Sequence, residues 1–149
     1  MSAIPSGVPA ADAVGPALVL IAEDEEPLAE TVAFAVREAG YTPLVALHGR
    51  QALELARDRR PALLILDLML PYVDGAAIVA ALRSDAQRAG TAMPPIILMT
   101  GASPVQTRAA GSDVILRKPF HLADLERLLH RFLATAAEVT DTGPRSSND

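Results

Sequence analysis

Charged or hydroxyl side chains end or follow four of the short aliphatic runs in this sequence. They are two acids after the first run, one in the third, a hydroxyl after the fourth and an amine after the fifth: Glu23, Asp24, Asp67, Thr100 and Lys118. Two or three carboxylates suit Mg²⁺, which prefers a few oxygen ligands and keeps some of its waters. A hydroxyl and an ammonium can hold the oxygens of a transferred phosphoryl group. The set therefore predicts a site for a hard divalent cation and a phosphoryl group.

Asp67 is the candidate nucleophile of this set. It interrupts a strongly apolar run, and burying an unpaired carboxylate is costly, so it must reach the surface at a strand end or be paired. As a nucleophile it would form an acyl phosphate. Each of the other residues has an ordinary structural explanation when taken singly, such as an acidic partner for a helix N-terminus. Their convergence is what favours a site.

Lys118 is the only lysine of the chain, against twelve arginines. Lysine carries a compact point charge on a flexible stem, whereas arginine presents a wide planar fork. Alone, Lys118 could be a surface residue whose stem lies along apolar neighbours. Beside Asp67 it would supply the single small cation that a phosphoryl site requires.

The elements that must position these residues are five aliphatic runs alternating with segments of helical spacing. The runs are ALVLIA (17–22), TPLVAL (42–47), ALLILDL (62–68), PIILM (95–99) and DVILR (113–117). Runs that are apolar on both faces are typical of parallel strands covered on both sides. The alternation predicts a doubly wound α/β fold, a five-stranded parallel sheet with right-handed crossovers. Ligands of such sheets bind beyond the C-terminal strand ends, where four of the five runs deliver polar groups.

The helical segments carry start and stop signals. The stripe that begins at Leu28 is closed by Gly40, and Asp74 is expected to cap a later helix. The segment from Leu122 to Phe132 is the most clearly amphipathic. His48 follows the second run beside an expected helix start, and no role is assigned to it.

Composition and charge exclude several classes of protein. The chain of 149 residues has no cysteine, which excludes disulfides, thiol chemistry and cysteine metal sites. A net charge of −5 argues against nucleic-acid binding, and no glycine-rich phosphate loop is present. No basic residue precedes Arg37 and no apolar stretch could span a bilayer, so we expect no membrane association and a cytoplasmic location.

The ends of the chain differ in composition from its centre. Residues 1–16 and 137–149 are rich in small and polar residues and are expected to be flexible extensions. A single domain is expected over residues 17–136, with no internal repeat and no linker that divides it.

Four motifs in order resemble the receiver domain of two-component response regulators, typified by the bacterial chemotaxis regulator. They are AEDE (22–25), LDLMLPYVDG (66–75), MTG (99–101) and KPF (118–120). The resemblance covers about residues 17–136 and implies the flavodoxin-like (βα)5 receiver fold. It also implies a signalling domain rather than an enzyme, limited to self-phosphotransfer and autodephosphorylation.

The resemblance implies a role for each motif residue. Asp67 would accept phosphate from a sensor histidine kinase or a histidine phosphotransfer protein. Mg²⁺ would be held by Asp24, Asp67 and the backbone carbonyl of Met69, with Glu23 contributing directly or through water.

The hydroxyl and the amine complete the implied site. Thr100 and Lys118 would contact the phosphoryl oxygens. The lysine–proline bond before Pro119 is usually cis in this family and would aim Lys118 over the site.

The sequence departs from the family in three places. Ile115 occupies the position where the family commonly has the aromatic residue that turns inward on phosphorylation. Thr100 and Lys118 lie 18 residues apart, about four fewer than usual, or roughly one helical turn. The fourth helix of the fold, between the fourth and fifth strands, is therefore expected to be short or missing. The loop DAQRAGTAMPP (85–95) is expected to be slightly long.

These observations favour a single-domain response regulator with an atypical output face. It would signal by protein–protein contact or phosphorelay, as a monomer or weak homodimer. One alternative is a pseudo-receiver scaffold that acts without phosphorylation. Another is a phosphatase of the haloacid dehalogenase type, although Met69 stands where such enzymes usually carry a second aspartate.

Overall fold

A parallel β-sheet of five strands forms the centre of the protein. The computed structural model describes residues 17–101 and 113–140. The strands lie in the order β2-β1-β3-β4-β5. They are β1 (Leu18–Ala22), β2 (Thr42–Ala46), β3 (Leu63–Asp67), β4 (Ile96–Thr100) and β5 (Val114–Arg117). Each predicted aliphatic run is therefore a strand, and the predicted doubly wound parallel sheet is confirmed.

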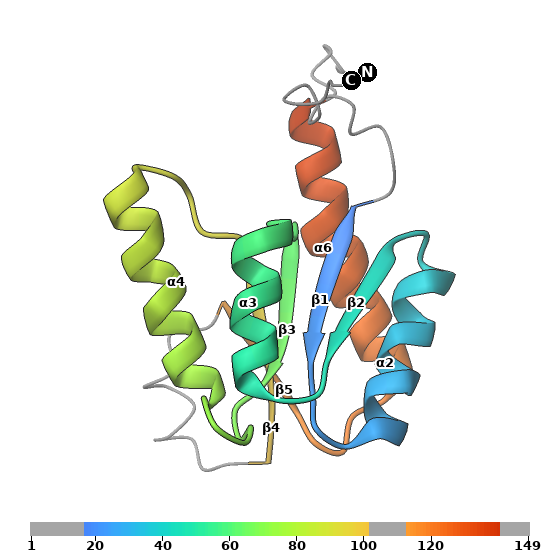
Figure 1. Cartoon of the computed structure of the whole chain (residues 1–149). Helices are drawn as coiled ribbons and strands as arrows, with labels where there is room; N and C mark the ends of the chain where they lie inside the picture. The colour runs from blue at the N-terminus through green and yellow to red at the C-terminus, as the bar shows by residue number, and fades with distance from the viewer. Residues whose placement is uncertain (1–16, 102–112, 141–149) are drawn as a thin grey trace, which may run out of the picture.

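Four helices of the described part of the chain cover the two faces of this sheet (Figure 1). They are α2 (Glu26–Glu38), α3 (Gly49–Arg59), α4 (Gly75–Ala89) and α6 (Leu122–Thr140). Helices α3 and α4 pack on one face, and α2 and α6 on the other. None of the helices described between residues 17 and 140 has the length and apolar character needed to cross a membrane.

Alternate strand residues supply two separate hydrophobic cores. Leu20, Leu64 and Leu98 pack toward α3 and α4, whereas Ile21 and Ile65 pack toward α2 and α6. All five side chains are fully buried. Because successive side chains of a strand point to opposite faces, both sets must be apolar, which explains the unbroken aliphatic runs.

Helix termini follow the signals in the sequence. The Asp74 side chain accepts a hydrogen bond from the Ala77 N–H at 2.9 Å, so the predicted cap of α4 is confirmed. Gly40 follows α2 with φ 93°, a conformation in which glycine is favoured. The His48 side chain caps α3 by accepting from the Gln51 N–H at 3.3 Å, a role that the sequence did not reveal.

The expectation of a long loop at residues 85–95 is wrong for the first half of this segment, which is helical. Helix α4 continues to Ala89 and ends at Gly90, which has φ 71°. Arg88 donates hydrogen bonds to Ser84 and Asp85 one turn earlier and supports this last turn. The connection to β4 therefore comprises only residues 90–95.

Other expectations concern parts of the chain that are not described. Residues 102–112, where the short or missing fourth helix of the fold is expected, lie outside the described residues. So do residues 1–16 and 141–149, which make up the expected N-terminal extension and most of the expected tail.

Candidate functional site

Three buried polar residues meet at the carboxyl ends of β1, β3 and β4. The exposed fractions of Glu23, Asp67 and Thr100 are 1%, 5% and 1%. Ala22 is paired with Leu66 and Asp67 with Met99, so the two acids lie on neighbouring strands and Thr100 lies beside them. The predicted convergence of these residues at one edge of the sheet is thus observed.

Lys118 links the two buried carboxylates. Its Nζ atom lies 2.9 Å from Glu23 Oε1 and 2.9 Å from Asp67 Oδ2. The backbone N–H of Lys118 donates to the Thr100 carbonyl at 3.0 Å, which extends the pairing of β4 and β5 to the lysine itself. The bond between Lys118 and Pro119 is cis, as the resemblance implied.

The environment raises the pKa of both Glu23 and Lys118, which favours the neutral form of the carboxyl and the charged form of the ammonium. Burial raises the pKa of the Glu23 carboxyl, and hydrogen bonds from Lys118 and from the Glu25 N–H only partly offset this effect. Burial would lower the pKa of the Lys118 ammonium, but hydrogen bonds to Glu23 and Asp67, together with the attraction of both charges, outweigh it and the pKa is raised. The lysine therefore stays charged, and a single ammonium lies beside a cluster of three carboxyl groups, an arrangement that a further cation would stabilise.

The acidic residues have the geometry of a metal site. Glu23, Asp24 and Asp67 each offer one carboxylate oxygen, and these atoms all lie within 4.8 Å of one another. Asp24 is exposed to solvent, whereas the other two are buried. A set of carboxylate oxygens with one side open to water fits the preference of Mg²⁺. The residues present thus suit the predicted ion.

Two predicted site residues have contacts that leave their roles open. The Met69 N–H donates to Asp67 Oδ1 at 3.0 Å, and the Met69 side chain is 64% exposed. The role of its carbonyl as a metal ligand stays a prediction. Thr100 is buried at the end of β4, and its contact with phosphoryl oxygens likewise stays a prediction.

Two glycines hold the loop that follows Asp67. A Cβ atom on Gly75 would lie 2.6 Å from the Asp67 carbonyl oxygen, and one on Gly49 would lie 1.6 Å from the Val73 carbonyl oxygen. Sequence reasoning missed this function of both residues. Glycine in the first turn of a helix sacrifices stability, so its presence at the start of both α3 and α4 is the signal that could have found them.

An aromatic cluster borders the same loop. Tyr72 is 79% exposed, has φ 69° and meets the His48 ring edge-on at 5.2 Å between centroids. The Arg50 guanidinium lies 5.9 Å from the Tyr72 ring centroid. His48 thus has a structural role at the rim of the site in addition to capping α3.

Comparison with known proteins assigns the fold and the motifs to one family. Residues 19–130 match the family model for the response regulator receiver domain. The phosphate regulon transcriptional regulatory protein PhoB of Pseudomonas aeruginosa is 34% identical over 133 residues, covering 87% of this chain and 54% of that protein. The chain spans about half the length of the curated relatives it matches.

Solved structures agree with this match. The chemotaxis response regulator CheY4 of Vibrio cholerae is 30% identical, with a TM-score of 0.69 over 78% of this chain and 98% of that one. The receiver domain of a sensor histidine kinase from Pseudomonas aeruginosa, solved with magnesium in its active-site cleft, is 26% identical. Its TM-score is 0.69 over 80% of this chain and 99% of that one.

Proposed function

The chain belongs to the response regulator receiver domain family, and from this premise we propose that Asp67 accepts a phosphoryl group from a histidine kinase or a histidine phosphotransfer protein. Receiver domains are phospho-acceptor signalling domains rather than conventional enzymes, and histidine kinases phosphorylate them. The observation that carries the proposal is the Lys118 ammonium, which lies 2.9 Å from both Asp67 and Glu23 beside a cluster of three carboxylates.

The transfer requires a carboxylate nucleophile held in a fixed orientation. Asp67 Oδ1 accepts from the Met69 N–H and Oδ2 accepts from Lys118 Nζ, so the carboxylate plane is fixed by two donors. An Asp67 oxygen forms the new bond to phosphorus, while the P–N bond to the donor histidine breaks and its electron pair leaves with the imidazole. Lys118 and Thr100 then hold the phosphoryl oxygens.

We propose that Mg²⁺ binds at the acidic residues. Receiver domains bind this ion at their acidic site, and one structural neighbour contains it there. In this chain Asp24, Asp67 and the Met69 carbonyl would hold it, with Glu23 directly or through water. When bound, the ion supplies positive charge that offsets the carboxylates and the phosphoryl oxygens.

Intact-mass measurement tests the phospho-acceptor role. Incubation of the protein with Mg²⁺ and acetyl phosphate should add the mass of one phosphoryl group to the wild type and none to Asp67→Asn. A matched variant, Asp58→Asn on α3, should be modified like the wild type. No addition to the wild type, or equal addition to the Asp67 variant, contradicts the proposal.

We also propose that the signal is passed by protein–protein contact or by phosphorelay through an atypical output face. Ile115 on β5 is 36% exposed, and an aliphatic side chain cannot make the inward turn of the usual aromatic residue. This feature also supports the pseudo-receiver scaffold as the second candidate function. A folded wild-type protein that binds a partner but gains no phosphoryl mass would favour that second candidate. Family membership argues against the haloacid dehalogenase-type phosphatase.

A further inference from the structure

A groove lies between the C-terminal halves of α3 and α4, at the end of the sheet opposite the acidic site. It has a volume of about 530 Å³. Its lining is mainly aliphatic and includes Ala56, Leu64, Leu82, Ala86 and Met93. An apolar hollow of this size suits a short apolar segment rather than an ion.

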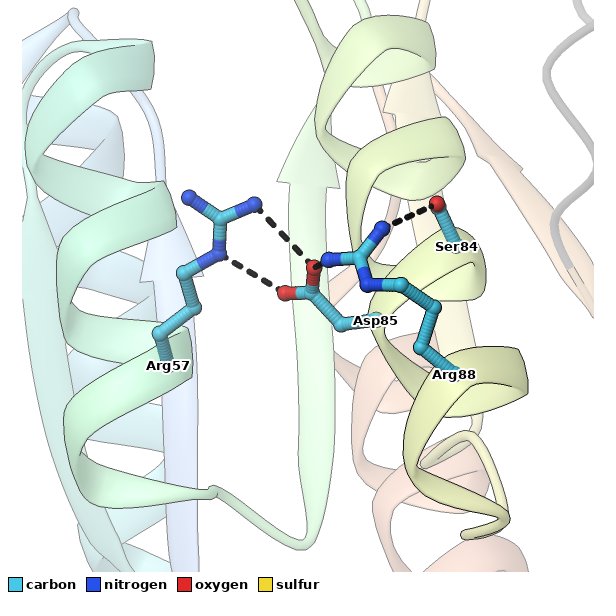
Figure 2. A network of polar contacts seen from close by, with 4 residues as sticks. All are labelled: Arg57, Ser84, Asp85 and Arg88. Atoms are coloured by element: carbon cyan, nitrogen blue, oxygen red, sulfur yellow. Dashed lines mark hydrogen bonds and ion pairs between the residues drawn. The ribbon is translucent and has the colours of Figure 1, made fainter.

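One edge of the groove is held by an ion-pair network between the two helices (Figure 2). Arg57 Nε on α3 donates to Asp85 Oδ2 on α4 at 2.7 Å, and Arg88 Nη2 donates to Asp85 Oδ1 at 2.8 Å. Asp85 therefore accepts from both guanidinium groups and bridges the two helices.

Arg60 differs from Arg57, the other basic residue that lines this groove. It lines the groove, is exposed and has a left-handed backbone conformation with φ 48° at the end of α3. Its guanidinium has no ion-pair partner among residues 17–101 and 113–140. A ligand of this groove should thus combine aliphatic groups with one negative charge.

The start of the described chain adjoins the groove. The Ala62 N–H donates to the Leu18 carbonyl at 2.8 Å, and Ala62 lines the groove. Sixteen residues precede Ala17, and an extended segment of that length reaches about 50 Å. The segment MSAIPSGVPAADAVGP contains aliphatic residues, and its only charged side chain is Asp12.

We propose that residues 1–16 bind back into this groove, with Asp12 paired to Arg60 and with Ile4 and Val8 on the aliphatic floor. The opposite charges are complementary, and the tether holds the segment at an effective concentration in the millimolar range. The prolines of the segment reduce the conformational freedom that is lost on binding. This interaction is independent of phosphorylation, because the groove and the acidic site lie at opposite ends of the sheet.

Paramagnetic relaxation enhancement tests the interaction in the full chain. Since the chain has no cysteine, Ser6→Cys provides a single attachment point for a spin label. The amide signals of Ala86, Thr91 and Met93 should broaden, whereas that of Phe34 on the opposite helical layer should not. Asp12→Asn and Arg60→Gln should each at least halve the broadening. The matched variant Arg59→Gln, which does not line the groove, should leave it unchanged.

Three results with the singly labelled chain would overturn the proposal. They are no broadening at the groove, weak broadening spread over all faces, or broadening that Asp12→Asn and Arg60→Gln do not reduce. A second copy of the chain is tested as the occupant by mixing spin-labelled chains that lack ¹⁵N with ¹⁵N chains that lack the spin label. In this mixture, any broadening must come from another chain. Broadening at the groove in this mixture, as strong as in the singly labelled protein, also overturns it. Asp12 precedes β1, so its substitution tests the contact without altering the sheet or helices.

Discussion

The single lysine of the chain joins residues that lie far apart in sequence. Lys118 contacts Glu23 on one side and Asp67 on the other, and its side chain is 25% exposed. Without it, two carboxylates would face each other in a largely buried position. Breaking a buried ion pair from one side is costly because the remaining charge is uncompensated.

Replacement of this lysine should destabilise the protein. For Lys118→Gln we expect a loss of about 1–3 kcal/mol in the free energy of unfolding. The loss should be limited because Glu23, whose pKa burial already raises, can take up a proton. Urea denaturation without Mg²⁺ measures it, with the exposed Arg37→Gln as control. Equal stability of Lys118→Gln and the wild type would show that the pair contributes nothing net.

Removal of an acidic residue should weaken metal binding. Asp24→Asn removes an exposed carboxylate of the cluster and should lower Mg²⁺ affinity by about tenfold or more, since affinity follows the number of charged ligands. Titration calorimetry measures the affinity, and Asp58→Asn, which replaces another exposed aspartate, should bind like the wild type. Unchanged binding by the Asp24 variant would place the ion elsewhere.

Residue-level prediction succeeded where a strand end determines position. Glu23, Asp67, Thr100 and Lys118 follow aliphatic runs, so the strand-end rule predicted that they converge. The double contact of Lys118 was not predictable, because it depends on side-chain reach across two strands. The capping role of His48 was missed for a similar reason: histidine is a less common cap than Ser, Thr, Asp or Asn.

At the scale of elements, the loop after β3 is hydrogen-bonded to the first turns of α3 and α4. The Gly49 N–H donates to the Pro71 carbonyl, and the Gly75 N–H donates to the Leu68 carbonyl. At both positions the neighbouring backbone leaves no room for a Cβ atom. Backbone contacts to both helices therefore help to fix the loop that carries Met69, in addition to the hydrogen bond from its N–H to the Asp67 side chain.

A methyl group at Gly75 should disturb this arrangement. Gly75→Ala places an atom against the Asp67 and Leu68 backbones, and overpacking of this kind costs about 1–3 kcal/mol. It should also lower the rate of phosphorylation by acetyl phosphate. Gly101→Ala is the stability control, because among the described residues no atom outside its two chain neighbours lies within 4 Å of the added Cβ. If both variants unfold at the same urea concentration, the close approach of the Asp67 and Leu68 backbones does not restrict position 75 to glycine.

The bridge between α3 and α4 should make stability depend on pH. Hydrogen bonding by Arg57 lowers the pKa of the Asp85 carboxyl, so the stabilisation is fully present above its ordinary pKa of about 4. It is lost as the pH falls through the lower folded-state value. Asp85→Asn should thus have a lower Tm than the wild type at pH 7, and the difference should vanish in acid. The control Asp58→Asn should show no pH-dependent difference in Tm from the wild type. A Tm difference for Asp85→Asn that does not change with pH would contradict the stabilising role of the Asp85 carboxylate.

The boundaries of helices and strands were predictable from the sequence only where apolar residues mark them. The five strands were located to within one residue at every end, because aliphatic runs stop where burial stops. The end of α4 was missed because DAQRA is polar and resembles a loop. Its helical state depends on Gly90 and on contacts of Arg88 within the last turn, which periodicity does not reveal.

At the scale of the whole molecule, the sheet separates two functional ends. The acidic site lies at the carboxyl edge of β1, β3, β4 and β5, and the aliphatic groove lies at the amino edge between α3 and α4. A doubly wound parallel sheet with right-handed crossovers was predictable as a fold class, whereas the order β2-β1-β3-β4-β5 was not predicted. The groove was not, because it arises from the spacing of two helices that only tertiary packing determines.

The central claim is that Asp67 forms an acyl phosphate, and borohydride trapping tests it most directly. Reduction of an aspartyl phosphate converts that residue to homoserine, which tandem mass spectrometry locates in the peptide that contains Asp67. After incubation with Mg²⁺ and acetyl phosphate, homoserine should appear at position 67 and at no other aspartate. Its absence from position 67, or its appearance at another acidic residue such as Asp24, would contradict the claim.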